Sequence, residues 1–449
     1  MTPARLAAAR VLVAVERGRT TLGAEVDSAR GDVGDKDRGL LLELAAGTLR
    51  WQNELDACLQ LVSDRAIAGL HPEIRAVLRL GAYQLRHLDR VPVHAVVHEA
   101  VETVKRLGHG RASGFVNVVL RSLARRGEVR LPARPADDTD RAAALAYLSV
   151  TLSHPEWLAS RWLSRYGFSG AERWCQFNNS PPDLTVRAIH ATESEGQLLD
   201  DLRAESAAAR PASFVRDAIV LPAGALGRLT PARRDRLAVQ EEASQIVAHA
   251  VGARRGQHVL DLCAAPGGKT AILAAELDGD GVLVASDSRA RRVELLRSTL
   301  RRAQINASVV ALDATRPLPF GPAFDRVLVD APCSGLGILR RDPDLKWSRR
   351  AEDLQGFADT QHKMLSHAAG VVRPGGRLIY ATCSSEPEEN DAVVDRFLSE
   401  HPGFTLARTD PGPAVDRADT LIDERGFLRT LPHKHGLDAF FAATLHRED

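Results

Sequence analysis

Two cysteines, each at the end of an expected β-strand, are the residues of this sequence best suited to chemistry. Cys333 lies in the segment DAPCSGLG at 330–337, and Cys383 lies in YATCS at 380–384. One buried cysteine is commonly a small core residue, but two thiols at neighbouring strand ends favour a shared reaction. The five cysteines are 50 or more residues apart and form no zinc-binding spacing, so we expect no metal site and no disulfide framework.

A thiol beside a methyl donor suits methyl transfer to a pyrimidine carbon. Carbon-5 of cytosine is a weak nucleophile, but a thiolate that adds to carbon-6 turns the ring into an enamine whose carbon-5 reacts readily. Asp330, which begins the first of the two segments, is expected to hydrogen bond ring nitrogen-3 and to stabilise that adduct. A base must then remove the carbon-5 proton so that the thiol can leave.

The loop DLCAAPGGKT at 261–270 is the expected binding site of the methyl donor. It is not a P-loop, because Cys263 stands where that motif needs its first glycine, and GxGxxG is absent from the chain. Its Pro-Gly-Gly turn into a helix N-terminus offers backbone N–H groups to an anionic ligand group. Asp287 and Asp313 end the next two expected strands, where carboxylates can bind the ribose hydroxyls and the adenine amino group.

This set fits S-adenosyl-L-methionine, an adenosine that ends in a carboxylate, better than a pyrophosphate. An aspartate at a strand end can instead cap the following helix, but three such ends in succession favour a ligand site. Lys269 is placed to contact either the donor's carboxylate or the target. The predicted cofactor-binding residues are Cys263, Ala264, Ala265, Pro266, Gly267, Gly268, Lys269, Asp287, Asp313 and Asp330.

Strands and helices alternate from about Gln240 onward, which favours a parallel, doubly wound sheet. The expected strands are HVLDL (258–262), VLVASD (282–287), SVVALD (308–313), FDRVLVDAPC and GRLIYATC. Ligands of such sheets bind at the carboxyl ends of the strands, where these aspartates and cysteines fall. We therefore predict a catalytic domain over 236–449.

The rest of the chain precedes this domain. Apolar residues at helical spacing predict an all-helical domain over 1–135, with helices that begin near Pro72 and Pro92. Arg50, Arg79 and Arg86 are compatible with solvated surface charges. A linker and a small α+β module at 141–235 follow.

RNA contacts are expected from basic side chains. The stretch 105–134 holds eight basic residues and one acidic residue, so it can bind phosphates. The predicted RNA-binding residues are Arg121, Arg125 and Arg126 in this stretch, with Arg341 and Lys346 around the mouth of the catalytic site.

Composition limits the class of protein. The 449 residues carry 59 basic and 58 acidic side chains, and 44% are hydrophobic, which is typical of a globular protein and not of a uniformly basic one. We find no apolar run as long as a membrane span and no export signal. The expectation is a cytoplasmic protein that works as a monomer.

These motifs together resemble the motif series of RNA (cytosine-5) methyltransferases. In that family the cysteine of the Thr-Cys pair is the nucleophile, which maps onto Cys383. The cysteine of the Pro-Cys pair assists product release, which maps onto Cys333. DNA enzymes attack with the Pro-Cys thiol, so Thr382 before Cys383 favours RNA. The family's Asp-Gly-Phe-Phe appears here with Ala439 in place of glycine, a change that we expect to be tolerated.

The helical part is similar to NusB, an RNA-binding fold, in its segments LRLGAYQL, VPVHAVVHEAVE and GFVNVVLRSLARR. The combination resembles the RsmB/Sun (Fmu) family. This resemblance implies an all-α NusB-like domain, a small α+β linker module and a C-terminal α/β Rossmann-like class I methyltransferase domain. It also implies methylation of 16S ribosomal RNA, naked or in a partly assembled small subunit. The alternatives are a non-catalytic RNA-binding factor of ribosome assembly and a methyltransferase that acts on tRNA or DNA.

Overall fold

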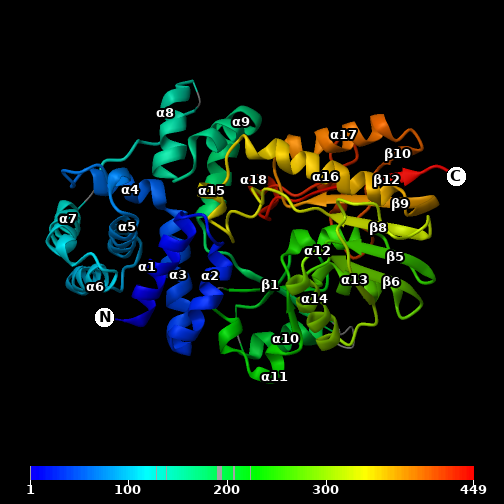
Figure 1. The fold of residues 1–449 in the computed structure, drawn as a ribbon, viewed down its shortest axis with the longest axis horizontal. Helices are drawn as coiled ribbons and strands as arrows, with labels where there is room; N and C mark the ends of the chain where they lie inside the picture. Colours follow the sequence, from blue (N-terminus) through cyan, green and yellow to red (C-terminus); the bar gives the residue numbers. More distant parts are fainter. Residues whose placement is uncertain (1, 128, 138, 190–194, 206–207, 223) are drawn as a thin grey trace. The chain divides into compact units, whose positions relative to one another are not determined.

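The computed structural model describes residues 2–127, 129–137, 139–189, 195–205, 208–222 and 224–449, and Figure 1 shows its helices and strands. The chain forms two compact units. The first comprises Met1–Pro181 with Leu339–Ala351, and the second comprises Pro182–Ile338 with Glu352–Asp449. The boundary expected at 135–141 falls inside the first unit, so the division into three domains stays a prediction. Among the described residues, no helix has both the length and the apolar character of a membrane span.

The described part of the first unit is helical, as predicted. Its α-helices are α1 Pro3–Glu16, α2 Leu22–Ala29, α3 Arg38–Arg50, α4 Gln52–Gln60, α5 Pro72–His87, α6 Val93–Arg106, α7 Ser113–Arg126, α8 Arg141–Ala146, α9 Glu156–Asn179 and α15 Leu345–Ser348. Shorter turns are η1 Arg30–Asp32, η2 Asp35–Asp37, η3 Ile67–Gly69, η4 Gly110–Ala112 and the π-helix η5 Tyr147–Thr151. The two predicted starts are confirmed, because Pro72 opens α5 and Pro92 directly precedes α6.

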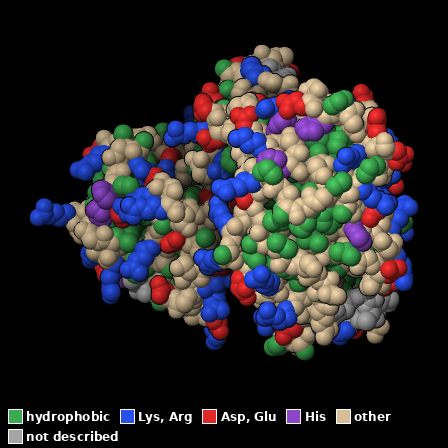
Figure 2. Space-filling model, turned by 45° about the vertical axis from the view of Figure 1, so that its right-hand side comes forward, with side chains coloured by type: hydrophobic (Ala, Val, Ile, Leu, Met, Phe, Trp, Pro, Cys, Tyr) green, Lys and Arg blue, Asp and Glu red, His purple; other side chains and the backbone are tan. Residues whose placement is uncertain are grey.

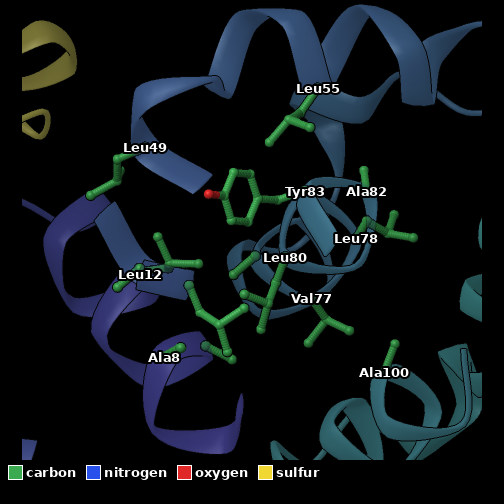
Figure 3. Close-up of a cluster of buried hydrophobic side chains, with 14 of the residues drawn as sticks. Ala8, Leu12, Leu49, Leu55, Val77, Leu78, Leu80, Ala82, Tyr83 and Ala100 are labelled. Atoms are coloured by element: carbon green, nitrogen blue, oxygen red, sulfur yellow. The ribbon is translucent and has the colours of Figure 1, made fainter. Parts of the chain in front are cut away.

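The core of this unit lies between α1, α3 and α5. Leu12, Leu49 and Leu80 pack around the ring of Tyr83, all of them buried (Figure 3). Helices α3 and α5 touch because Gly47 has no side chain: a Cβ there would lie 2.1 Å from Cζ of Tyr83. Apolar residues at helical spacing therefore predicted both the helices and their buried faces.

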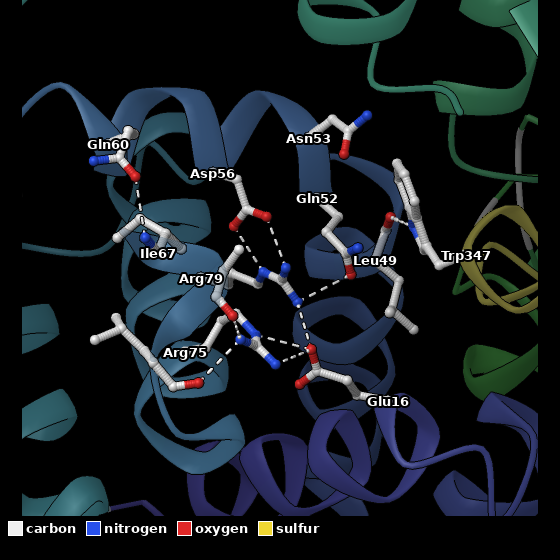
Figure 4. Close-up of polar contacts among 12 residues, drawn as sticks. Glu16, Leu49, Gln52, Asn53, Asp56, Gln60, Ile67, Arg75, Arg79 and Trp347 are labelled. Carbon is white, nitrogen blue, oxygen red and sulfur yellow. Dashed lines mark hydrogen bonds and ion pairs between the residues drawn. The ribbon is translucent and has the colours of Figure 1, made fainter. Parts of the chain in front are cut away.

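Three arginines that the sequence allowed as surface charges are instead structural, so that interpretation was wrong. Arg79 is buried and donates two 2.7 Å hydrogen bonds to Asp56, next to Gln52 and Glu16 (Figure 4). Arg50 is buried and bonds the carbonyl oxygen of Arg340, and Arg86 pairs with the buried Glu54. A forked guanidinium can satisfy several acceptors at once, which lets these charges leave water.

The second unit begins with a small antiparallel sheet. Its strands are β1 Leu184–Ala188, β2 Arg210–Pro211, β3 Ala218–Leu221 and β4 Leu237–Val239, in the order β2-β3-β1-β4. Helices α10 Glu195–Glu205, η6 Leu226–Arg228 and α11 Pro231–Arg234 accompany it. This is the α+β composition expected for the module that precedes the catalytic domain.

A large sheet dominates the second unit. Its strands are β5 Gln257–Leu262, β6 Gly281–Asp287, β7 Ser308–Ala311, β8 Phe324–Asp330, β9 Val372–Thr382, β10 Phe404–Ala407, β11 Leu428–Arg429 and β12 Phe441–Arg447. The order is β10-β12-β9-β8-β5-β6-β7, with β11 beside β12. Strands β5 to β9 are parallel, but β12 runs antiparallel between β9 and β10. The sheet is therefore mixed: the five strands expected from the sequence are parallel, as predicted, and β12, which was not predicted, runs antiparallel to them.

Helices cover both faces of this sheet (Figure 1). Helices α16 Asp353–Ala369 and α17 Asp391–Glu400 pack on one face. The other face is covered by α12 Glu242–His249, α13 Gly268–Leu277 and α14 Ala290–Arg302. The remaining short helices are η7 Pro387–Glu389, η8 Ala418–Leu421 and α18 Pro432–His435. From β5 the sheet continues through β6 and β7 on one side and through β8 and β9 on the other, so the order of strands reverses between β5 and β8. Ligands of such sheets bind at the strand ends beside this reversal.

Candidate active site

The predicted cofactor loop joins β5 to α13 in a tight turn. Cys263 has φ +65° and Gly267 has φ +108°, both in the left-handed region, and the Ala265–Pro266 peptide bond is cis. The amide of Ala264 donates to the carbonyl of Ser286 at 2.7 Å, which fixes the loop beside β6. A side chain at Gly267 would be strained by its φ, and its Cβ would lie 3.0 Å from Leu296. The turn thus brings the backbone to the start of α13, as expected.

Two buried carboxylates beside this loop keep an acceptor oxygen free of hydrogen bonds from the described residues. Asp261 is 0% exposed and accepts from Thr270 Oγ1 at 2.6 Å through Oδ2, whereas its Oδ1 has no donor. Asp287 is 4% exposed. Its Oδ2 lies 3.0 Å from Arg292 Nε but in poor hydrogen-bond geometry, so it also lacks a donor. Buried acceptors normally have partners, so these two oxygens fit a ligand that carries hydroxyl donors, such as a ribose.

Burial strongly raises the pKa of the Asp261 carboxyl group. Removal from water raises its pKa to about 7, against the lowering effect of the Thr270 hydrogen bond. Burial and the charges of Asp330 and Asp287 likewise raise the pKa of the Cys263 thiol. Cys263 therefore stays protonated at neutral pH and lines the loop without acting as a nucleophile.

Asp313 lies two residues beyond β7 and differs from the other acids. It is exposed, and its Oδ1 accepts from the amide of Thr315 at 3.0 Å and from the Thr315 hydroxyl at 2.6 Å. These bonds lower its pKa. The amide of Leu312 donates to the carbonyl of Asp287 at 3.1 Å, so the strand ends that carry the two acids lie side by side. Contact of Asp313 with an adenine stays a prediction.

Lys269 and Asp330 form an ion pair at the end of β8, with Nζ 2.7 Å from Oδ2. Burial lowers the pKa of Lys269, but the charge of Asp330 and its hydrogen bond outweigh this effect, so the pKa is raised. The ammonium also lies 5.5 Å from the ring centre of Phe440, a favourable cation–π distance. Lys269 therefore contacts the residue expected to bind the cytosine ring.

The side chains of the two predicted cysteines lie next to each other. Cys333 Sγ lies 3.2 Å from Cys383 Sγ, although 50 residues separate them in the chain. The hydrogen bond to Cys383, followed by burial and the charge of Cys383, raises the pKa of Cys333 well above its ordinary value. Either sulfur can donate the hydrogen bond of this contact, and the raised pKa keeps Cys333 in its thiol form.

A close backbone contact holds the Cys383 loop. The amide of Gly337 donates to the carbonyl of Cys383 at 2.9 Å, and the amide of Ala439 donates to the carbonyl of Gly337 at 2.9 Å. A Cβ on Gly337 would lie 2.0 Å from the carbonyl oxygen of Ala439 and 2.7 Å from that of Cys383. The positive-φ residues do not include Ala439, so the alanine fits where the resemblance expected glycine.

The expected RNA contacts fall in the first unit, and one of them is wrong. Arg121, Arg125 and Arg126 lie on α7, where all three are exposed. Arg341 is half-buried. Lys346 is 1% exposed, and its Nζ donates to the carbonyls of Arg50 and Ser153 and to Asn179 Oδ1, so it is not available to RNA.

Figure 2 shows basic side chains interspersed with acidic and neutral ones on the face in view, in keeping with the balanced net charge.

Within the described residues, one cluster of potential metal ligands occurs, His71, Glu73 and His109 in the first unit. No residue of the candidate site belongs to it. Asp261 lies in the loop predicted at 261–270 and at a strand end, but sequence reasoning assigned no ligand to it. Gly337 and Phe440 were missed, because no local pattern marks their contacts with the site.

Comparison with protein families assigns three segments of the chain. Residues 248–446 match the model described as 16S rRNA methyltransferase RsmB/F. Residues 2–125 match the NusB family, and residues 154–225 match the ferredoxin-like domain of RsmF/B-like methyltransferases. The resemblances noted in the sequence are confirmed.

Full-length relatives agree with this assignment. The chain is 36% identical to ribosomal RNA small subunit methyltransferase B of Pseudomonas putida, over 98% of both proteins. It is 32% identical to the protein of that name from Vibrio cholerae, over 99% of this chain and 97% of the relative. Among solved structures, PH0851 has a TM-score of 0.81 at 23% identity, over 100% of this chain and 99% of that one, which shows a shared fold. A methyltransferase homologue from Pyrococcus horikoshii has a TM-score of 0.56 at 25% identity, over 68% of this chain and 99% of that one.

The NusB-like helices, the ferredoxin-like module and the sheet with its paired cysteines thus occur together in one chain. The chain belongs to the RsmB family of 16S ribosomal RNA methyltransferases.

Proposed function

We propose that this enzyme transfers a methyl group from S-adenosyl-L-methionine to carbon-5 of one cytosine in 16S ribosomal RNA through a covalent bond between Cys383 and the base. The observation that carries the proposal is the meeting of the two thiols, 3.2 Å apart at the ends of β8 and β9. An enzyme that methylates an amine or a hydroxyl needs no such pair, whereas addition to a pyrimidine ring uses a nucleophilic thiol.

The residues around the loop at 263–269 fit the methyl donor. Asp287 and the adjacent Asp261 offer buried acceptor oxygens to its ribose, and Asp313 lies at the adjoining strand end for its adenine. The start of α13 offers backbone N–H groups to its carboxylate. When bound, S-adenosylmethionine supplies an electrophilic methyl group.

The thiols act in sequence in this proposal. The Cys383 thiolate adds to carbon-6 of the cytosine, and the electron pair of the 5,6 double bond moves to carbon-5. As the adduct forms, nitrogen-3 takes a proton from solvent, and Asp330, held by Lys269, accepts the hydrogen bond from that N–H and stabilises the adduct until the proton returns to solvent. Carbon-5 then takes the methyl group from the sulfonium, with the neutral thioether as the leaving group. It still carries its hydrogen, which must leave before the aromatic ring can form again.

Cys333 is suited to this last step because of the cause of its raised pKa. The hydrogen bond and the charge of Cys383 contribute to that rise, and both vanish once Cys383 is a neutral thioether. Cys333 can then lose its proton to solvent and accept the carbon-5 proton as a thiolate base. The 5,6 double bond re-forms, and Cys383 leaves as the thiolate, which restores the starting pair.

The RNA is held by the exposed face of α7 with Arg121, Arg125 and Arg126, by Arg341 and by the ferredoxin-like module. The target base must leave its stack or already be single-stranded to reach the thiols. All groups that the reaction needs come from a single chain, so we propose a monomer that uses no metal. Ribosomal RNA as the substrate implies action in the cytoplasm.

Mapping of 5-methylcytosine in ribosomal RNA tests this function. Bisulfite sequencing or mass spectrometry compares 16S RNA from cells that have the protein, cells that lack it, and cells that carry Cys383→Ser. We expect one cytosine to be methylated only in the first strain. A methylation pattern that is identical in all three strains would overturn the proposal.

A further inference from the structure

Glu389 is a fully buried carboxylate that the reaction above does not use. It ends η7, between β9 and α17, and is 0% exposed. Four donors surround it: Oε1 accepts from the amide of Ser334 at 2.8 Å and from Gln361 Nε2 at 2.9 Å. Oε2 accepts from the hydroxyls of Ser334 and Ser384, each at 2.5 Å.

Both serines that bind Glu389 are chain neighbours of the two cysteines. Ser334 directly follows Cys333, and Ser384 directly follows Cys383. One carboxylate therefore ties together the loops that carry the two thiols. Gln361 adds a further link between Glu389 and the Cys333 loop, because its Nε2 also donates to the carbonyl of Pro332 at 3.0 Å.

A carboxylate suits the donors around this position. Both of its oxygens only accept, so it can serve all four donors at once, whereas Nε2 of a glutamine would donate and would force the hydroxyls of Ser334 and Ser384 to accept instead. All four donors are neutral groups. Removal of a carboxyl group from water costs free energy, so a carboxyl group at this buried position points to a constraint beyond packing.

The two loops depend on Glu389 to different degrees. Ser334 uses both its amide and its hydroxyl on Glu389. The Cys383 loop makes one hydrogen bond to Glu389, through the Ser384 hydroxyl, and has support of its own because Asn390 Nδ2 donates to the carbonyl of Ser384 at 2.9 Å. Loss of the carboxylate therefore releases Cys333 more than Cys383.

We propose that Glu389 is a positioning residue that holds Cys333 beside Cys383 and that it governs release of the methylated base rather than formation of the covalent bond. This inference rests on the proposed function, because it assigns different steps to the two thiols.

Trapping of RNA on the full-length enzyme separates the two steps. RNA with 5-azacytosine has nitrogen at ring position 5 and no proton to remove, so its adduct reports bond formation alone. RNA with ordinary cytosine also requires release. With Glu389→Gln we expect adduct formation on 5-azacytosine RNA close to that of the wild type. We expect release from ordinary RNA to slow by about tenfold or more, so that a covalent complex accumulates.

Glu388→Gln is the matched control, because it makes the same change at the neighbouring, half-buried position. It should accumulate no complex. Ser384→Ala keeps the carboxylate and removes one donor, so it should accumulate less complex than Glu389→Gln, and it serves as the test variant if Glu389→Gln does not fold. Equal slowing of formation and release, or no accumulation with either variant, would overturn the positioning role. Failure of the wild type to trap 5-azacytosine RNA would instead overturn the proposed function.

Discussion

Lys269 Nζ lies 2.7 Å from Asp330 Oδ2, so the cofactor loop and the end of β8 share one ion pair. The pair joins the residue that follows the Pro-Gly-Gly turn to the residue that precedes the Ala-Pro-Cys turn. Binding of the methyl donor and of the cytosine ring can be coupled through this contact, because any shift of one loop displaces the charge that the other requires.

Replacement of Lys269 by methionine tests which ligand the lysine serves. Since its ammonium pairs with Asp330, we expect Lys269→Met to slow covalent addition to cytosine by about tenfold or more through a misplaced and uncompensated Asp330. Affinity for S-adenosylmethionine should stay near that of the wild type in calorimetry. A large loss of cofactor affinity with normal addition would assign Lys269 to the donor's carboxylate.

Asp287 should contribute directly to cofactor affinity. Its buried Oδ2 lacks a donor among the described residues, so Asp287→Ala removes an acceptor that a ribose would satisfy. We expect a loss of about 1–3 kcal/mol in binding free energy, measured by calorimetry with S-adenosylmethionine. Asp313→Ala is the comparison, and its effect should be smaller because that carboxylate is exposed and already bonded to Thr315. Unchanged affinity of Asp287→Ala would remove Asp287 from the site.

Gly337 leaves no room for a side chain between two carbonyl oxygens. Gly337→Ala would place a Cβ 2.0 Å from the oxygen of Ala439 and 2.7 Å from that of Cys383, so the Cys383 loop must move. A displacement of about 1 Å can lower a rate by about a hundredfold, and we expect a loss of that order in single-turnover methylation. Gly356→Ala is the control, because its Cβ would meet open space on α16. Normal turnover of Gly337→Ala would show that the loop position is not critical.

The raised pKa of Asp261 predicts that the free energy of unfolding depends on pH. Its pKa is about 7 in the folded protein and near 3.8 in an unfolded chain, so the folded state binds the proton more tightly. The free energy of unfolding therefore falls as pH rises from about 4 to 7. Between about pH 5.5 and 7.5 this fall amounts to about 2 kcal/mol.

Asp261→Asn removes this titration and keeps an acceptor for Thr270. Urea unfolding at the two pH values should show that the variant gains about 2 kcal/mol relative to the wild type at the higher pH. An equal difference between the two proteins at both pH values would mean that Asp261 does not titrate in this range.

Much of this site was accessible from sequence because its parts follow strand ends. The apolar runs before Asp287, Asp330 and Cys383 predicted β6, β8 and β9, and parallel strands bring their carboxyl ends to one edge. Strand β12 was missed, because nothing local in FAATLHR marks its antiparallel insertion beside β9.

Long-range contacts account for the other errors. Lys346 has the charge of a surface residue, and its three acceptors come from Arg50, Ser153 and Asn179, which are far away in the chain. Glu389 lies in the acidic run EPEEND, which has the composition of an exposed loop. Burial of such residues is decided by tertiary partners that no local pattern reveals.

The most direct test of the proposed function is whether the sulfur of Cys383 forms the covalent bond to RNA. Purified wild-type protein, Cys383→Ser and Cys333→Ser are each incubated with S-adenosylmethionine and 16S RNA that contains 5-azacytosine, and intact mass measures covalent attachment. We predict attachment for the wild type and for Cys333→Ser and none for Cys383→Ser. Attachment that survives in Cys383→Ser and disappears in Cys333→Ser would contradict the assignment of the nucleophile.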